Sequence, residues 1–362
     1  MFMKQTDQMN VLNVPKNKKV FYLDVIRALA CLLVVMIHSS MNFAVQEIDS
    51  IAFLFGNVFD SMARPGVPLF VMLSGALMLD ENYHFTKSKW IRRIALMTLF
   101  YVFWSVAYCV VYRIFFPIIK REPVDMAIVF SYIINGHYHL WFIPMIIGTY
   151  LLVPILRMWV QTKNIRQIEY FLCLSLLFTF FAKPVVEFCS LVFPDSEKIT
   201  IFNNLGMQSC TGYVVYFILG WYLANKNPFK PIHLYLMGFV GLLITIVGTY
   251  LLFALVETDE FFFYSNFSVN ILAYSAAVFS LIKLFFEKTA YRNHKVHHAV
   301  SFIAKNSLGI YAVHAFLITV FYRLFSDVYP LFAILAVFTL AMIVSAAVTM
   351  IMRRIPVLKN LV

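Results

Sequence analysis

Residues 20–41 read VFYLDVIRALACLLVVMIHSSM, and this stretch decides the fold. It is long enough to cross a bilayer as one helix, which takes about 20 predominantly apolar residues. Similar stretches recur along the whole chain of 362 residues, of which 62% are hydrophobic and only 13% are charged. Soluble domains contain about 45–50% apolar residues, so a soluble enzyme is excluded. The sequence therefore predicts an all-α polytopic membrane protein.

The apolar stretches predict about ten transmembrane helices. The second is interrupted at Arg64, Pro65 and Gly66, because proline removes a helical hydrogen-bond donor. We expect a single membrane-embedded domain over residues 1–362, which includes a basic cytoplasmic tail over residues 1–19, and no second domain. The approximate bounds of the expected spans are 20–41, 53–79, 94–116, 139–157, 168–193, 209–224, 233–256, 266–285, 306–325 and 331–352.

The net charge of +11 is distributed in short basic clusters between the apolar stretches. This pattern indicates membrane topology, and we expect no nucleic-acid partner. If the N-terminus is cytoplasmic, most of the 29 Lys and Arg residues fall in inner loops, so the positive-inside rule predicts both termini in the cytoplasm. The five cysteines show neither a CxxC pattern nor a metal-ligand spacing, and we expect no metal.

The first span carries three polar residues, Asp24, Arg27 and His38. Charges inside a membrane are costly and mark candidate functional sites. His38 follows Arg27 by eleven positions, almost three helical turns, so the two share one face at an axial separation of about 16 Å. A plainer interpretation remains open, in which Arg27 is a snorkelling anchor paired with Asp24 and His38 makes a structural hydrogen bond.

Arg64 has Asp60 one turn before it and the helix-breaking residues Pro65 to Pro68 after it. Broken helices at membrane depth are tolerated where they line a cavity, so this segment is a candidate cavity wall. Alternatively, Asp60 and Arg64 only neutralise each other.

A basic run precedes the third span, with Lys89, Arg92 and Arg93 within two turns of a helix. Arginine binds phosphate through two parallel hydrogen bonds, so the run is a candidate site for a phosphorylated cytosolic molecule. The alternative is a purely topological role.

Three further histidines stand beside or within apolar stretches. His137 and His139 precede the fourth span, but two histidines without nearby cysteines or carboxylates are a weak metal signal. His314 lies in the ninth span with Tyr311 on the same face, three residues earlier, and a structural pair is the plainer interpretation.

Together these segments resemble the acyltransferase-3 family of integral-membrane acyltransferases. The first span resembles the family's signature of Arg, ten residues and His. Four more segments match in order: Arg64-Pro-Gly-Val-Pro-Leu-Phe-Val-Met-Leu-Ser74-Gly75, the basic run, His139-Leu-Trp-Phe with Pro154 after it, and Ser307-Leu-Gly-Ile-Tyr311-Ala-Val-His314. Lys89 stands where the family has the first arginine of an Arg-x-x-Arg element. The resemblance is greatest to stand-alone O-acetyltransferases that act on enterobacterial common antigen and similar surface glycans.

The resemblance implies a multi-pass protein of the bacterial inner membrane that transfers an acyl group, in the first place acetyl, from cytosolic acyl-CoA. The implied acceptor is a hydroxyl of a cell-envelope polysaccharide or of its lipid-linked precursor. His38 is implied as the catalytic base, with Arg27 as its partner and Asp24 beside it. Lys89, Arg92 and Arg93 are implied to bind coenzyme A. The expected cavity residues are Arg64, Ser74, His139, Tyr311 and His314.

Two other functions fit the same polar residues. A transporter or flippase for a lipid-linked saccharide would also use a broken helix and polar groups near the midplane, although many transporters have internal repeats and none is evident here. A membrane subunit without chemistry of its own is the third possibility.

Overall fold

The computed structural model describes residues 14–193, 212–226, 228–256, 261–288, 294–359 and 361–362. Within these ranges the chain is helical and contains no strand, which confirms the all-α prediction. Its first half comprises α1 Val14–Ala44, α2 Ile51–Ala63, α3 Gly66–Met78, α4 Lys87–Cys109, the π-helical segment Val110–Phe115, α5 Phe116–Lys120, α6 Met126–Asn135, the 3-10 turn Tyr138–Trp141, α7 Phe142–Leu151 and α8 Val153–Gln161. Its second half comprises α9 Ile165–Ser175, the π-helical segment Leu176–Ala182, α10 Lys183–Val192, α12 Tyr213–Asn225, α13 Pro231–Val256, the 3-10 turn Phe262–Tyr264, α14 Val269–Lys288, α15 His294–Phe325 and α16 Pro330–Arg354.

Eight helices of the described chain are long and apolar enough to cross a membrane. The pair Tyr138–Leu151 and Val153–Gln161, bent by 50°, can form a ninth span. These nine correspond to nine of the ten expected spans. The tenth, 209–224, corresponds to α12, whose 13 residues extend only about 20 Å against a hydrocarbon core of about 30 Å. Residues 209–211 lie outside the described ranges, so the tenth crossing stays a prediction.

The expected interruption of the second span is present as a short turn. α2 ends at Ala63 and α3 begins at Gly66, yet the two helices together qualify as one candidate span, Ile51–Met78. The expected tail over residues 1–19 overlaps α1, which begins at Val14, and residues 1–13 lie outside the described ranges.

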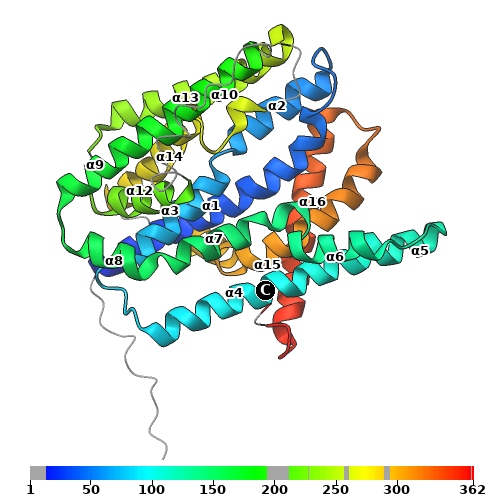
Figure 1. Cartoon of the computed structure of the whole chain (residues 1–362), viewed down its shortest axis with the longest axis horizontal. Helices are drawn as coiled ribbons and strands as arrows, with labels where there is room; N and C mark the ends of the chain where they lie inside the picture. The colour runs from blue at the N-terminus through cyan, green and yellow to red at the C-terminus, as the bar shows by residue number, and fades with distance from the viewer. Residues whose placement is uncertain (1–13, 194–211, 227, 257–260, 289–293, 360) are drawn as a thin grey trace, which may run out of the picture.

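α1 and α3 lie in the middle of the bundle, with α9, α10 and α13 on one side and α4, α5 and α6 on the other (Figure 1). α3 and α12 pack closely because both carry glycines at the contact. A Cβ atom on Gly75 would overlap the carbonyl oxygen of Phe217, and one on Gly220 would overlap that of Met72. Small residues allow helix backbones to approach closely in membranes.

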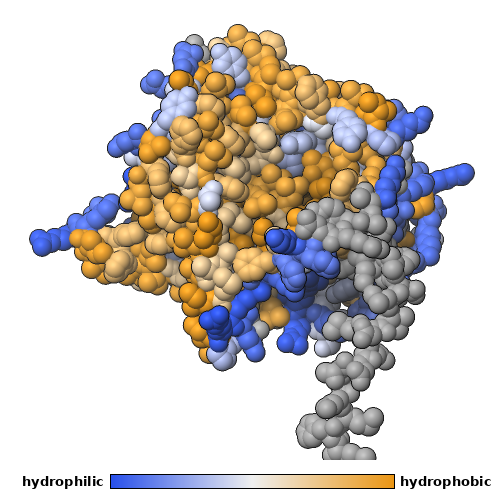
Figure 2. All heavy atoms as spheres, turned by 180° about the vertical axis from the view of Figure 1, so that it is seen from behind, coloured by the Kyte–Doolittle hydropathy of each residue, from blue (hydrophilic) through white to orange (hydrophobic). Residues whose placement is uncertain are grey.

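The outer surface suits a bilayer. Figure 2 shows a broad hydrophobic face, with hydrophilic residues gathered towards its edges. Large apolar side chains such as Phe239 and Met158 are exposed on the helices by 66% and 68%. Such a surface would be unfavourable in water, so the protein is a polytopic membrane protein.

Candidate active site

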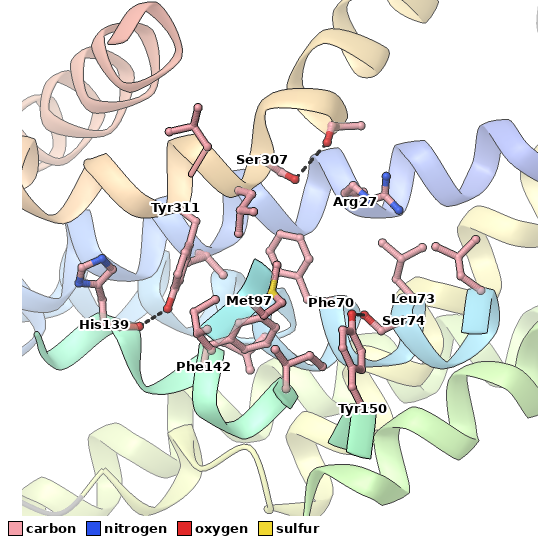
Figure 3. Close-up of a pocket in the computed structure, with 18 of the residues that line it drawn as sticks. Arg27, Phe70, Leu73, Ser74, Met97, His139, Phe142, Tyr150, Ser307 and Tyr311 are labelled. Atoms are coloured by element: carbon pink, nitrogen blue, oxygen red, sulfur yellow. Dashed lines mark hydrogen bonds between the residues drawn. The ribbon is translucent and has the colours of Figure 1, made fainter. Parts of the chain in front are cut away.

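A cavity of about 360 Å³ lies between α1, α3, α4, α7, α15 and α16. Arg27 and His38 of α1 both line it, so the structure brings the two polar residues of the first span to one cavity. Figure 3 shows Arg27 at one end, His139 and Tyr311 at the other, and Phe70, Met97 and Phe142 between them. The cavity therefore has two polar ends joined by an apolar middle.

Asp24 accompanies Arg27, although it is not among the described residues that line the cavity. Its carboxylate lies 3.9 Å from the Arg27 guanidinium, and the two side chains are 31% and 33% exposed. An ion pair this long and this accessible contributes little to stability. Arg27 therefore keeps donors that can turn into the cavity.

Four cations from four helices line one end of the cavity, which we call the basic end: Arg27 of α1, Arg93 of α4, Lys305 of α15 and Arg353 of α16. The Arg353 guanidinium donates a hydrogen bond to the backbone carbonyl of Lys305 at 2.6 Å. The Arg93 guanidinium carbon lies 5.4 Å from the centre of the Tyr150 ring. This end therefore concentrates positive charge at one opening.

The residues of the basic run lie on the first two turns of α4 and face different sides of the helix. Arg93 lines the cavity, whereas Lys89 and Arg92 are exposed and do not belong to its described lining. Lys305 and Arg353 were not predicted as site residues. Both stand near the ends of spans, where cations are expected for topology alone. Lys305, Leu308 and Tyr311 follow one another at three-residue intervals, and this stripe was the available signal.

A pair of hydroxyl groups lies on the wall across from Arg27, at the basic end of the cavity. The Ser74 Oγ and Tyr150 hydroxyl oxygens lie 3.2 Å apart, and both residues line the cavity (Figure 3). Trp90 fixes the Tyr150 backbone, because its indole N–H donates to the Tyr150 carbonyl at 2.8 Å. Tyr150 was not among the predicted site residues.

Four histidines gather at the other end, which we call the histidine end: His38, His137, His139 and His314. The ring centre of His314 lies 5.1 Å from that of His38 and 5.3 Å from that of His139. His38 and His139 line the cavity, whereas His314 is fully buried behind them. The Tyr311 hydroxyl donates a hydrogen bond to the backbone carbonyl of His139 and so ties α15 to the start of α7.

His137 joins this cluster although the sequence did not predict it. Its Nδ1 lies 2.7 Å from Nδ1 of His139, and its ring stacks on Tyr108 with centres 4.4 Å apart. Burial, followed by the charges of His314 and Arg113, lowers the pKa of His137 to about 4. The His137 imidazole is therefore neutral at pH 7, and one of the two facing Nδ1 atoms carries the hydrogen.

Arg64 was predicted to line the cavity, but it does not belong to the described lining. It forms an ion pair with Asp60, which is fully buried, and its guanidinium carbon lies 4.0 Å from the centre of the Tyr264 ring. Val67, three residues later, lines the cavity, while Arg64 is absent from the described lining. The arginine is thus occupied by a buried carboxylate and an aromatic ring.

The described residues contain no group of three or more His, Cys, Asp or Glu side chains placed to hold a metal ion. Imidazole can accept or donate a proton near neutral pH, and the neighbouring cations can bind an anion.

Comparison with known proteins gives one match. The acyltransferase-3 family model, which describes an acyltransferase domain, matches residues 20–354. Curated proteins and solved structures gave no match. The matched region covers nearly the whole chain and includes both ends of the cavity. The chain therefore belongs to the acyltransferase-3 family and is an integral-membrane acyltransferase.

Proposed function

We propose that this protein transfers an acyl group, in the first place acetyl, from acyl-CoA to a hydroxyl of a cell-envelope polysaccharide or its lipid-linked precursor. The proposed location is the bacterial inner membrane with both termini in the cytoplasm. One observation carries the proposal: a single cavity has four cations from four helices at one end and imidazole side chains at the other.

The basic end suits the phosphates of coenzyme A. Arg27, Arg93 and Arg353 offer guanidinium groups, which bind phosphate through paired hydrogen bonds, and Lys305 adds a fourth charge. In the proposed topology this end faces the cytosol, where acyl-CoA is found. Lys89 and Arg92 lie on the same first turns of α4, outside the cavity, where they can attract the donor before it binds.

The middle of the cavity suits the long arm that carries the thioester. Phe70, Leu73 and Met97 give it apolar walls, and the Ser74 and Tyr150 hydroxyls can bond to the amides of that arm. Arg27 and His38 are separated by about 16 Å along α1, so a donor bound by its phosphates has to extend through this middle to reach His38.

His38 is the proposed base, because it is the α1 histidine that is partly exposed in the cavity. A neutral imidazole accepts the proton of the acceptor hydroxyl as its oxygen attacks the thioester carbonyl carbon. The C–O bond forms, the C–S bond breaks, and the imidazolium returns the proton to the thiolate sulfur. The products are the ester and free coenzyme A, with no net gain or loss of protons.

Aromatic side chains beside the histidine end suit a sugar acceptor. Trp141 lines the cavity and is 40% exposed, and Tyr138 lies next to His38 and is 58% exposed. Tyr and Trp offer a large apolar face together with a polar tip, which fits a ring that carries hydroxyl groups.

The proposal is tested with purified protein in liposomes, acetyl-CoA labelled in the acetyl group, and a cell-envelope glycan fraction. We expect thiol release and labelled glycan in equal amounts, and neither product when the acceptor is omitted. His38→Ala should abolish both products, while His298→Ala, on the exposed surface of α15, should leave them unchanged. Movement of the acceptor across the bilayer without thioester loss would instead identify a transporter and overturn the proposal.

A further inference from the structure

His314 lies behind the proposed base and has no role in the chemistry described so far. It is fully buried in the middle of α15. Its Nδ1 lies 2.7 Å from the Tyr311 carbonyl oxygen, and its Nε2 has no hydrogen-bond partner among the described residues. A buried polar atom without a partner is energetically costly, so this nitrogen calls for an explanation.

The bond at Nδ1 determines what Nε2 can do. A carbonyl oxygen only accepts hydrogen bonds, so Nδ1 must carry the hydrogen. In neutral imidazole the other nitrogen then holds a lone pair and acts only as an acceptor. The backbone of α15 therefore sets His314 as a fixed acceptor inside the histidine end.

Two rings are close enough to donate to that acceptor. The His38 ring centre lies 5.1 Å away with the rings tilted by 42°, and the His139 centre lies 5.3 Å away with the rings at 89°. Ring nitrogens lie about 1 Å from the ring centre, so both separations can hold a hydrogen bond of about 3 Å. The His38 ring centre is the nearer of the two.

His139 is engaged through one ring nitrogen and its backbone carbonyl, while its Nε2, like that of His314, has no hydrogen-bond partner among the described residues. Its Nδ1 faces Nδ1 of His137 at 2.7 Å, and its backbone carbonyl accepts a hydrogen bond from Tyr311. These two contacts hold His139 in place between the 3-10 turn Tyr138–Trp141 and α15. His38 makes ring contacts with His314 and Tyr138 instead.

We propose that His314 is a positioning residue for His38. A small rotation of the two rings lets its Nε2 accept the N–H of one His38 nitrogen, which fixes the tautomer and the ring orientation, and the other His38 nitrogen then presents its lone pair to the cavity. This inference rests on the proposed function, in which His38 is the base. Bases in enzymes are commonly oriented by a third group through such a bond.

The test compares two substitutions at one position. His314→Leu removes the acceptor, and His314→Gln keeps an acceptor oxygen. His298→Leu, on the exposed surface of the same helix, is the matched control. We expect His314→Leu to lower kcat by about 10–100-fold, the range seen when the partner of a functional histidine is removed, with an unchanged KM for acetyl-CoA. His314→Gln should recover at least half of that loss on a logarithmic scale.

A spectroscopic measurement separates orientation from simple packing. Nitrogen NMR of protein labelled in histidine should show one His38 tautomer in the wild type and in His314→Gln, and a mixture in His314→Leu. Equal losses of kcat in the two variants, or an unmixed tautomer in His314→Leu, would overturn the inference.

The outcomes for His38 and His314 can be told apart. If His38→Ala retains wild-type turnover, the proposed base is wrong and this inference fails with it. If His38→Ala is inactive while His314→Leu turns over normally, the proposed function stands and only the role of His314 is rejected.

Discussion

The two ends of the cavity are built in opposite ways. At the basic end the side chains are charged, Lys305 and Arg353 are exposed, and each cation comes from a different helix. At the histidine end the rings are largely buried, and main-chain groups of His139 and Tyr311 hold them. An ion pair at a solvent-exposed site contributes little stability, whereas a buried polar group is costly when it lacks its hydrogen-bond partner. The difference supports the proposal that the basic end binds the donor and that the histidine end performs the chemistry.

The largest effect should appear at the histidine end. In His38→Ala we expect kcat to fall by about 10²–10⁴-fold, the usual contribution of a general base, while the KM for acetyl-CoA stays within about twofold. Steady-state kinetics in liposomes at several donor concentrations measure both constants. A rise in KM with unchanged kcat would place His38 in donor binding and remove the contrast between the ends.

The next effect concerns the basic end. Arg93→Gln should raise the KM for acetyl-CoA by about 3–10-fold with little change in kcat, because a bond to a charged group in a solvent-accessible site is worth about 1 kcal/mol or slightly more. Arg92→Gln is the matched comparison and should raise the KM less, since this neighbouring arginine is exposed and outside the described lining.

The dependence of the KM on salt concentration tests the same comparison. Exposed charges are screened over about 8 Å at physiological ionic strength, so added salt should raise the wild-type KM and should raise it less in Arg93→Gln. Equal KM values for Arg92→Gln and Arg93→Gln would mean that the run acts as a whole. Membrane orientation has to be checked in both variants, because the loss of an inner cation can disturb topology.

The smallest effect on kinetics should appear at the hydroxyl pair of Ser74 and Tyr150. Tyr150→Phe removes the hydroxyl that faces Ser74 and should lower kcat/KM by about 2–5-fold, the value of one ordinary hydrogen bond. Tyr170→Phe, at an exposed position of α9, serves as control and should have no effect. A loss of kcat/KM as large as that of His38→Ala would mean that the Tyr150 hydroxyl takes part in the chemistry.

The fold could be predicted from the sequence to a large extent. Long apolar stretches leave few alternatives to membrane helices, and the break after Arg64 follows from the chemistry of proline. The length of α12 could not be predicted, because an apolar stretch does not show where a helix begins. Its 13 residues form a short helix packed against α3.

The candidate site was predicted less completely, because the sequence does not show which way a side chain points once the helices have packed. Periodicity placed Arg27 and His38 on one face but did not show which cation of the basic run faces inwards. Arg157 illustrates the same limit. The positive-inside rule counts it as an inner topology charge, yet it is buried and donates to the carbonyls of Met78 and Asp80 at 2.6 and 2.9 Å. Only tertiary packing tells a topological cation from a structural one.

The glycine contact between α3 and α12 has a mechanical consequence. Backbones that touch at Gly75 and Gly220 leave no slack, so the cavity wall that carries Ser74 is stiff. α4 forms the opposite wall, and many of its side chains are exposed, such as Leu99 at 52%. We therefore expect α4 to move when a bulky donor enters the cavity. A spin label at Leu99 should move relative to α3 when acetyl-CoA is added, and an unchanged distance would show that the passage is already open.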